Sequence, residues 1–571
     1  MKYLRIYILI FLVMPFVACE DQNINSVPLD YADADFIYND SINIDAYVNN
    51  LYAYIPTGFG RFGGAMLAAI TDEAVYSPTG TTVQKWATGS WDSNFLPDNP
   101  LPSSYEGIRL TYVYQNDIDP YIPAKILTQE TRNHYKAQAQ FIRALLNFEI
   151  LKRFGGYPLV TGVLDAGKPI SIPRSNFDEC VSYISTLCDS AAMYLPLSVN
   201  AANLGRVTKG AALALKSRLL LYAASPLYNN PAEPENNVYH GAYDPSKWEK
   251  AAAAAAAVIN LTENGSKVYA LHSTLASNSI FVGANVANLT NKETILYKLS
   301  PMSNSMEKAN APIGYNSGGG GNCPTADLVE AYGFRLTGMP FNFENPDHIA
   351  NIWTERDRRI NYSIVRNDAK YNTYTVQTYV GGADNNPSNP NSTRTGFYLM
   401  KLMNPNVNWW STAVNSYHPW NVFRYAEILL NYAEAMNEAY GADSDPKGYG
   451  MTARQAVKLI RDRVATLQNA DFSISAPAGN KEAFRRDVQN ERRIELAFEE
   501  HRYWDLRRWK LAETILNQPV HGLQIIKNAD GSYTYSKYVA ENRVFTEKMY
   551  YYPFPNTELK RNPALVQNKG W

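Results

Sequence analysis

The chain has 571 residues, more than a single hydrophobic core usually fills. Its 53 basic and 54 acidic side chains give a formal net charge of −1, so nothing points to a nucleic acid or an acidic membrane surface as the main partner. The sequence contains 41 tyrosines and 10 tryptophans. Such side chains build cores, and they also bind ligands that are partly polar, because each has a flat face and a polar tip.

The first residues are typical of a secretion signal. Lys2 and Arg5 form a basic start, and residues 7–17 form an apolar run that is too short for a membrane-spanning helix. Ala18 directly precedes Cys19, as at a lipoprotein processing site. We therefore predict a lipoprotein whose first residue after processing is a lipidated cysteine.

This prediction divides the N-terminus in two. Residues 1–18 form the signal peptide, and residues 19–39 form a lipidated N-terminus with an extended tether, since they are polar and contain Pro28. Acyl chains on Cys19, at about 0.8 kcal/mol per buried methylene, would hold the protein on a membrane. An ordinary signal peptide that merely contains a cysteine is the alternative.

The polar motifs give no catalytic or metal site. The remaining cysteines, Cys180, Cys188 and Cys323, form neither a disulfide framework nor a metal-binding pattern. The seven histidines contain no His-Glu-x-x-His, and there is no Gly-x-Ser-x-Gly elbow or phosphate-binding loop. We therefore predict no metal and no cofactor.

Helical periodicity dominates the first half of the chain after the tether. Residues 40–54 have helical spacing and residues 65–75 a shorter helical pattern, followed by a polar loop over 76–102. Four later segments, 135–154, 209–224, 247–261 and 420–440, look like related helices. Their shared pattern is small residues on one face followed by two leucines and an aromatic, and 247–261 includes seven consecutive alanines. Helix faces lined by small residues let helices approach closely, and this predicts a stack of helix pairs of the tetratricopeptide type. The predicted helices are 135–154, 177–195, 209–224, 247–261, 420–440 and 452–467.

The composition changes between residues 269 and 419, where the sequence predicts long loops rich in Gly, Asn and Pro. Residues 371–380 alternate Tyr, Thr and Val like an edge strand, and the proline-containing tail over 550–571 should be largely extended. The predicted fold is mainly α, a tetratricopeptide-like helix-pair scaffold with a loop-rich subdomain carrying minor β-structure. Its parts are 40–268 (N-terminal helical part), 269–419 (loop-rich subdomain) and 420–571 (C-terminal helices and tail).

Residues 490–509 contain no Gly or Pro and predict one helix. Its Arg and Glu side chains recur every three or four residues, which would align them on one face. Because the same helix carries large aromatics, we expect it to lie deep in the protein with its charges paired, since unpaired burial would be costly. The charged positions are Arg492, Glu495, Glu499, Arg502 and Asp505.

The pattern Asn-Glu-Arg-Arg-x-Glu-Leu-x-Phe-Glu-x-x-Arg-x-x-Asp-Leu-x-Arg-Trp in this stretch resembles the signature of the SusD/RagB family. Further matching segments lie at 141–159, 324–332, 356–359, 424–430 and 562–571, although 356–359 lacks the usual proline. The resemblance thus covers nearly the whole mature chain. It implies an outer-membrane glycan-binding lipoprotein that works with a SusC-like TonB-dependent transporter, and the acidic Glu20-Asp21 after Cys19 implies that it faces the cell exterior.

Tryptophans in polar loops are the candidate ligand-binding residues. Trp86 and Trp91, with Asn94 beside them, suit stacking on a sugar face with hydrogen bonds at its edge. In the resembled family the corresponding loop often contributes to the glycan site; anchoring of the loop on the core is the alternative reading. Trp409 and Trp410 are the second candidates and Tyr371 with Tyr374 the third, whereas Trp353, Trp504 and Trp509 are assigned to packing.

Glu495 and Glu499 raise the question of catalysis. Glycoside hydrolases use two carboxylates about 5–9.5 Å apart, and one helical turn separates side chains by about 5–6 Å. However, both would project from one helix face, and Arg492 and Arg502 would keep both ionised, whereas one must act as an acid. We therefore expect structural ion pairs and no enzymatic activity.

The predicted function is capture of an oligosaccharide at the outer membrane, through a lipid-anchored protein, and its delivery to the transporter. Two alternatives remain open. One is an endo-acting glycoside hydrolase, and the other is a surface protein that binds peptides or acts in adhesion.

Overall fold

The computed structural model describes residues 34–230, 242–273, 279–285, 289–466 and 474–571. The signal peptide and Cys19 therefore lie outside the described residues. The described residues are mainly helical, with 42% in helices and 11% in strands, as the sequence predicts. Within the described ranges, every helix is too short or too polar to cross a membrane.

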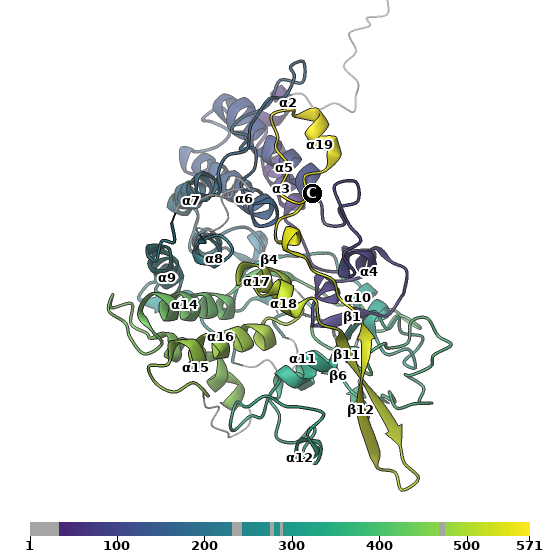
Figure 1. Cartoon of the computed structure of the whole chain (residues 1–571). Coiled ribbons are helices and arrows are strands. Elements are labelled where there is room, and N and C mark those ends of the chain that lie inside the picture. The colour runs from purple at the N-terminus through teal and green to yellow at the C-terminus, as the bar shows by residue number, and fades with distance from the viewer. Residues whose placement is uncertain (1–33, 231–241, 274–278, 286–288, 467–473) are drawn as a thin grey trace, which may run out of the picture.

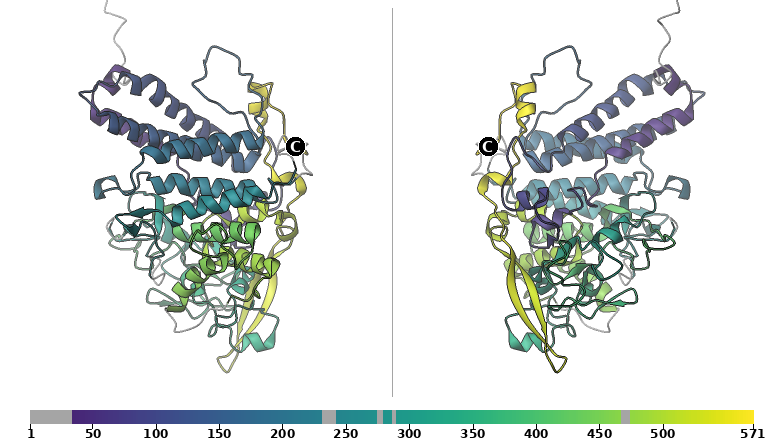
Figure 2. Two further views of the ribbon diagram at one scale, coloured as in Figure 1. Left: turned by 90° about the vertical axis from the view of Figure 1, so that its left-hand side faces the viewer. Right: turned by 90° about the vertical axis from the view of Figure 1, so that its right-hand side faces the viewer.

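The long helices form a stack (Figures 1 and 2), in which α5 to α9 each pack on the next along the chain. Helix α6 lies between α5 and α7, α8 lies between α7 and α9, and α9 contacts α14, which in turn carries α15 and α16. This is the tetratricopeptide-like scaffold. Its helices are α5 Leu101–Val113, α6 Gln129–Phe154, α7 Phe177–Tyr194, α8 Lys209–Ala224, α9 Ser246–Ile259, α14 Tyr425–Tyr440, α15 Ala453–Thr466 and α16 Lys481–Glu495.

Side-chain caps set the ends of these helices. Helix α8 has the predicted bounds and is capped by Thr208, and α7 starts with a capping box between Asn176 and Glu179. Helix α6 begins six residues earlier than predicted, because Thr128 accepts a hydrogen bond from the backbone N–H of Thr131 and starts the helix there. The apolar pattern identified only the buried part of α6.

The remaining helices are short and lie in loops, at the N-terminus or at the C-terminal end. They are α2 Ala34–Tyr38, α3 Ser41–Leu51, α4 Thr82–Ala87, α10 Ser305–Asn310, α11 Ala326–Ala331, α12 Pro346–Ile349, α13 Arg359–Ser363, α17 Arg502–Arg508, α18 Ala512–Ile515 and α19 Asn556–Arg561. Helix α19 occupies six residues of the tail over 550–571, for which the sequence predicts a largely extended chain.

The strands form six antiparallel pairs among the described residues. The long hairpin β11–β12 projects from the body (Figure 1), and the sequence reading did not find it. The pairs are β1 Ala74–Tyr76 with β5 Asn322–Pro324, β2 Thr262–Glu263 with β3 Ser266–Lys267, β4 Thr294–Lys298 with β10 Trp420–Arg424, β6 Ile364–Val365 with β9 Tyr398–Leu399, β7 Lys370–Tyr371 with β8 Tyr374–Thr375, and β11 Val520–Lys527 with β12 Tyr533–Glu541.

Three predicted elements change type. Residues 420–424 form strand β10 instead of the start of a helix, because β4 offers them an antiparallel partner. Residues 67–70 form a short 3₁₀ turn before β1 where a helix over 65–75 was predicted. The predicted edge strand over 371–380 shrinks to the tight β7–β8 hairpin, in which Asn372 has a positive φ of 54°.

The stretch 490–509 is two helices and not one. Helix α16 ends at Glu495, α17 begins at Arg502, and between them Phe498 and Glu500 have positive φ angles of 63° and 61°. Such angles are uncommon for residues other than glycine, so strong contacts must hold the turn. The contacts are buried ion pairs that one straight helix would not allow: Glu499 binds Lys401 and Arg424.

Glu495 is the centre of this buried ion network. Its carboxylate binds Arg463 at 2.5 Å, Arg424 at 2.8 Å and Arg359 at 2.9 Å. The predicted pairing is therefore confirmed, although the partners come from α15, β10 and α13 and not from a ladder on one helix. Arg502 likewise pairs with Asp72, which is distant in the sequence.

We predict that Glu495→Gln lowers the free energy of unfolding by about 3–5 kcal/mol, because three buried guanidinium groups each lose one carboxylate partner. Glu558→Gln is the matched control: Glu558 pairs with the exposed Arg561 in α19, and its loss should cost less than about 1 kcal/mol. Urea unfolding of the two purified variants measures both values. Equal losses would contradict a central role for the network.

The same network predicts a dependence on pH. Burial alone would raise the pKa of Glu495, but attraction by Arg463, Arg424 and Arg359 outweighs it and holds the pKa well below the ordinary 4.5. The stabilisation is therefore complete above the unfolded pKa and is lost as pH falls towards the folded pKa. Below about pH 4.5, the stability difference between wild type and Glu495→Gln should shrink. A constant difference down to acid pH would contradict this.

Candidate functional site

Two tryptophans on a loop form the most exposed part of a cluster of aromatic rings. Trp410 is 44% exposed, and Trp409 is half-buried beside it, with ring centroids 4.9 Å apart and ring planes at 89°. Both rings pack against Tyr315, at 5.8 Å for Trp409 and 5.1 Å for Trp410. Tyr315 also contacts Tyr371 at 5.0 Å and Tyr374 at 5.8 Å. We call these five residues the aromatic cluster.

The loop that carries the two tryptophans is closed by Asn408. Its backbone exchanges two hydrogen bonds with Val414, and its side-chain oxygen accepts from the N–H groups of Trp410 and Ser411. Asparagine in this role folds its own backbone into a turn. The indole N–H of Trp409 donates to the backbone carbonyl of Asn316 at 3.2 Å, which fixes the loop on the neighbouring segment.

The buried side chain of Asp384 holds Tyr374 of the cluster in place. It accepts hydrogen bonds from the Tyr374 hydroxyl at 2.9 Å and from the N–H groups of Gly314 and Gln377. Burial raises its pKa, and these donors oppose the rise. A side chain at Gly314 would meet the Tyr374 hydroxyl, 2.3 Å from the position of a Cβ, so glycine is required for this close approach.

Tyr315, at the centre of the cluster, is not among the residues that the sequence predicts for the site. Tyr315 lies directly before Asn316 and Ser317, which have positive φ angles of 48° and 58°, and Asn372 donates to its hydroxyl at 3.2 Å. A Gly-Tyr-Asn-Ser-Gly run was a signal of irregular backbone. Nothing in the sequence indicated which distant aromatics it would meet.

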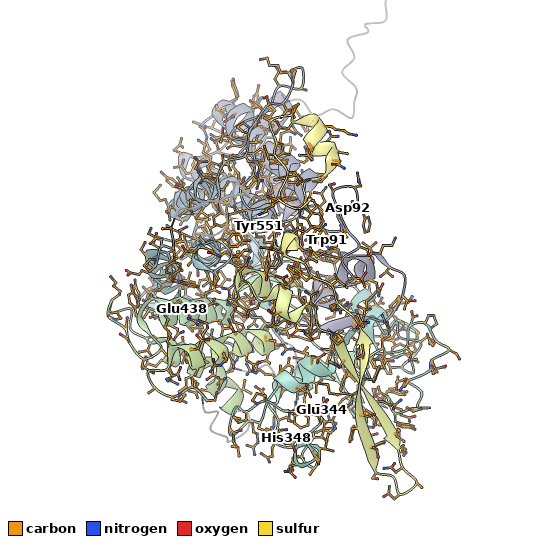
Figure 3. All side chains as sticks on the ribbon, in the orientation of Figure 1. Trp91, Asp92, Glu344, His348, Glu438 and Tyr551 are labelled. Carbon is orange, nitrogen blue, oxygen red and sulfur yellow. The ribbon has the colours of Figure 1, made fainter. Side chains whose placement is uncertain are left out.

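The structure corrects the first-ranked candidates. Trp86 is 3% exposed and Trp91 is 4% exposed, so neither ring offers a free face. Trp86 packs on Phe62, Tyr503 and Tyr552, and Trp91, labelled in Figure 3, packs on Tyr552 and on Trp571 at 4.7 Å. The alternative reading, in which they anchor the loop, describes them. Apart from Phe62, these partners come from α17 and the C-terminal tail.

Two further candidates, Asn94 and Tyr371, also differ from expectation. Asn94 is exposed, but its side-chain oxygen accepts a hydrogen bond at 2.7 Å from Asn556, at the start of α19, and Asn94 is not one of the five residues of the aromatic cluster. Tyr371 belongs to the aromatic cluster but is fully buried, so it supports Tyr315 and does not offer a stacking face itself. Of the six candidates, Trp409, Trp410 and Tyr371 lie together.

Other features of the described residues compete poorly as sites. Glu495 and Glu499 are buried and bound to arginine or lysine, and the hollows that they line measure only about 20 and 50 Å³. No group of three or more His, Cys, Asp or Glu side chains in the described ranges is placed to hold a metal ion. Two hollows of about 440 and 610 Å³ lie among the helices and are not lined by the aromatic cluster.

Comparison with known proteins identifies the class of this scaffold. The model of the SusD family matches residues 279–571, and a second model, described as starch-binding associating with outer membrane, matches residues 66–221. A helix-pair scaffold with an irregular aromatic surface is thus that of a SusD-like protein. The chain belongs to the SusD family.

Individual relatives agree. The chain is 30% identical over 145 residues to a SusD-like protein P2 of Formosa agariphila; the match spans 25% of this chain and 24% of that protein's length. A crystal structure of a SusD-like protein of Bacteroides fragilis is 26% identical with a TM-score of 0.77, covering 95% of this chain and 99% of that one. A SusD-like carbohydrate-binding protein of the same species shares the fold at 22% identity, with a TM-score of 0.73 and coverage of 93% and 100%.

We predict stability losses of different size for the two tryptophan sites. Trp91→Ala should lower the free energy of unfolding by about 3–5 kcal/mol, because it opens a cavity under the tail. Trp410→Ala removes a half-exposed ring and should cost only about 1–2 kcal/mol. Urea unfolding monitored by circular dichroism separates the two. A larger loss for Trp410→Ala would contradict its assignment to the surface.

Proposed function

We propose that this protein binds an oligosaccharide through the exposed ring of Trp410 and passes it, unbroken, to an outer-membrane transporter. The observation that carries the proposal is the 44% exposed indole among amides and hydroxyls in a member of the SusD family. The carbohydrate-binding relative of Bacteroides fragilis, which has the same fold, also supports it.

The chemistry of the surface suits a sugar. The C–H face of a pyranose stacks on an aromatic ring, while its hydroxyls need donors and acceptors at the ring's edge. The exposed Asn316, Asn372 and Ser411 lie on the segments that meet at Trp409 and Trp410, and their side chains supply both. Trp409 is held by its indole hydrogen bond and by Tyr315, so the surface is preorganised and loses little entropy on binding.

The proposal is one of capture without catalysis. A hydrolase needs one carboxyl group that is protonated and one that is ionised, flanking the scissile bond. Glu495 and Glu499 are instead enclosed by cations, and the pKa of Glu495 lies well below its ordinary value. No observation favours the alternative of an endo-acting glycoside hydrolase; binding of a peptide ligand is an outcome that the tests below would reveal.

We further propose that Cys19 carries a lipid anchor and that the protein faces outward beside a SusC-like TonB-dependent transporter. The support is the signal-like N-terminus and the description of the second family model, which names association with the outer membrane. The helical scaffold would dock on the transporter, which leaves the loops of the aromatic cluster free to hold the ligand.

We predict that Trp410→Ala weakens glycan binding at least about tenfold, as expected for the loss of a central aromatic contact. A glycan array first identifies a ligand for the wild type, and isothermal titration then measures the dissociation constants. Tyr194→Ala is the control, because Tyr194 is an exposed aromatic at the end of α7, outside the cluster. Unchanged binding in Trp410→Ala, or equal loss in both variants, would contradict the site. Reducing ends released from the glycan would contradict non-catalytic capture.

A second prediction concerns the anchor. In the native host, Cys19→Ser should move the protein from the membrane fraction to the soluble fraction, because its acyl chains cannot be attached. The wild type, extracted in mild detergent, should co-purify with a TonB-dependent transporter. Retention of Cys19→Ser in the membrane would contradict lipid anchoring, and wild-type protein that purifies without a transporter would contradict the partnership and favour an adhesive role.

A further inference from the structure

The segments that build the aromatic cluster are almost free of charge. Three stretches meet there: 314–318 supplies Tyr315, 370–375 supplies Tyr371 and Tyr374, and 406–415 supplies the two tryptophans. They read Gly-Tyr-Asn-Ser-Gly, Lys-Tyr-Asn-Thr-Tyr-Thr and Asn-Val-Asn-Trp-Trp-Ser-Thr-Ala-Val-Asn. In these stretches, all of which the structure describes, Lys370 is the one ionisable side chain apart from the tyrosines.

Lys370 does not serve the stacking surface. Its ammonium group donates to the hydroxyl of Thr375 at 2.5 Å, across the β7–β8 hairpin. The neighbouring Tyr371 is buried against Tyr315, and successive side chains of a strand point to opposite faces. Lys370 therefore lies on the face of the hairpin turned away from Tyr315.

The two acidic groups beside the cluster are also occupied. Glu307, whose charge acts on Tyr371, is fully buried and is hydrogen-bonded to the backbone N–H of Asn404 and to the ring of His418. Asp384 is fully buried, and its two oxygens accept three hydrogen bonds, from Gly314, Tyr374 and Gln377. A positively charged ligand at Trp410 would thus find the ring face but no free carboxylate in the aromatic cluster. Cation–π attraction at an exposed ring contributes only about 0.5–1 kcal/mol.

Charged glycans need what this surface lacks. Sulfate and uronate groups are recognised by arginine or lysine through charge-assisted hydrogen bonds, and amino sugars by carboxylates. An ionised group brought to an apolar ring surface without such a partner loses hydration and gains at most a weak cation–π attraction. The amides and hydroxyls of the three segments instead match neutral sugar hydroxyls.

We propose that the ligand of the aromatic cluster is an uncharged glycan, selected against sulfated, uronate-containing and amino-sugar polymers. This inference rests on the proposed function, since it names the class of sugar that the same surface takes. It predicts that binding involves stacking and neutral hydrogen bonds and therefore responds little to ionic strength.

The test compares oligosaccharides of matched length by isothermal titration with the protein lacking its signal peptide. The panel contains neutral, uronate-containing, sulfated and glucosamine oligosaccharides. The expected result is that the best ligand is neutral, that its dissociation constant changes less than about twofold between roughly 50 and 500 mM NaCl, and that Lys370→Met leaves it within about twofold.

The experiment distinguishes failure of this inference from failure of the proposed function. A charged oligosaccharide that binds about tenfold or more tightly than the neutral ones, weakens with salt and depends on Trp410 would overturn the inference while supporting the proposed function. Binding of no oligosaccharide of any class would overturn the proposed function and the inference with it. A large loss on Lys370→Met would also contradict the inference, because it would place a charge in the recognition.

Discussion

Two buried carboxylates join the parts of this protein that are far apart in sequence. A charge without a partner is costly inside a protein, so the positions of Glu495 and Glu499 fix the positions of the cations around them. Glu495 binds arginines from α13, β10 and α15, while Glu499 binds Lys401 and Arg424. The loop-rich region and the helix stack therefore meet at one charge cluster.

The same constraint places the candidate site. Lys401 and Arg424 lie on either side of the loop that carries Trp409 and Trp410, and both bind the single carboxylate of Glu499. The two ends of that loop segment are thus held together in the buried core, while its middle reaches the surface. Pairing of β10 with β4 and the hydrogen bond from Trp409 to Asn316 then fix its direction. An irregular segment fastened in this way can present a rigid ring.

The sequence predicts an element well where the residues that determine it are close together in the chain. Helix α8 has the predicted bounds, because its small residues and its threonine cap are adjacent in the chain. The break between α16 and α17 was missed, since no glycine or proline marks it and the turn is held by ion pairs to distant residues such as Asp72. Strand β10 was read as helix for a similar reason: its partner β4 lies over 120 residues away.

The tryptophans show why the site was harder to predict than the fold. Trp91 and Trp410 both lie in polar loops with amide and hydroxyl neighbours, so the sequence near them does not separate them. What separates them is contact across the chain. The C-terminal Trp571 and Tyr552 cover Trp91, whereas the partners of Trp410, Tyr315 and Trp409, leave it 44% exposed. Whether an aromatic ring in a loop is core or surface is decided by the residues that fold over it. A ring that its partners leave 44% exposed keeps surface for a ligand, and that is the position of Trp410.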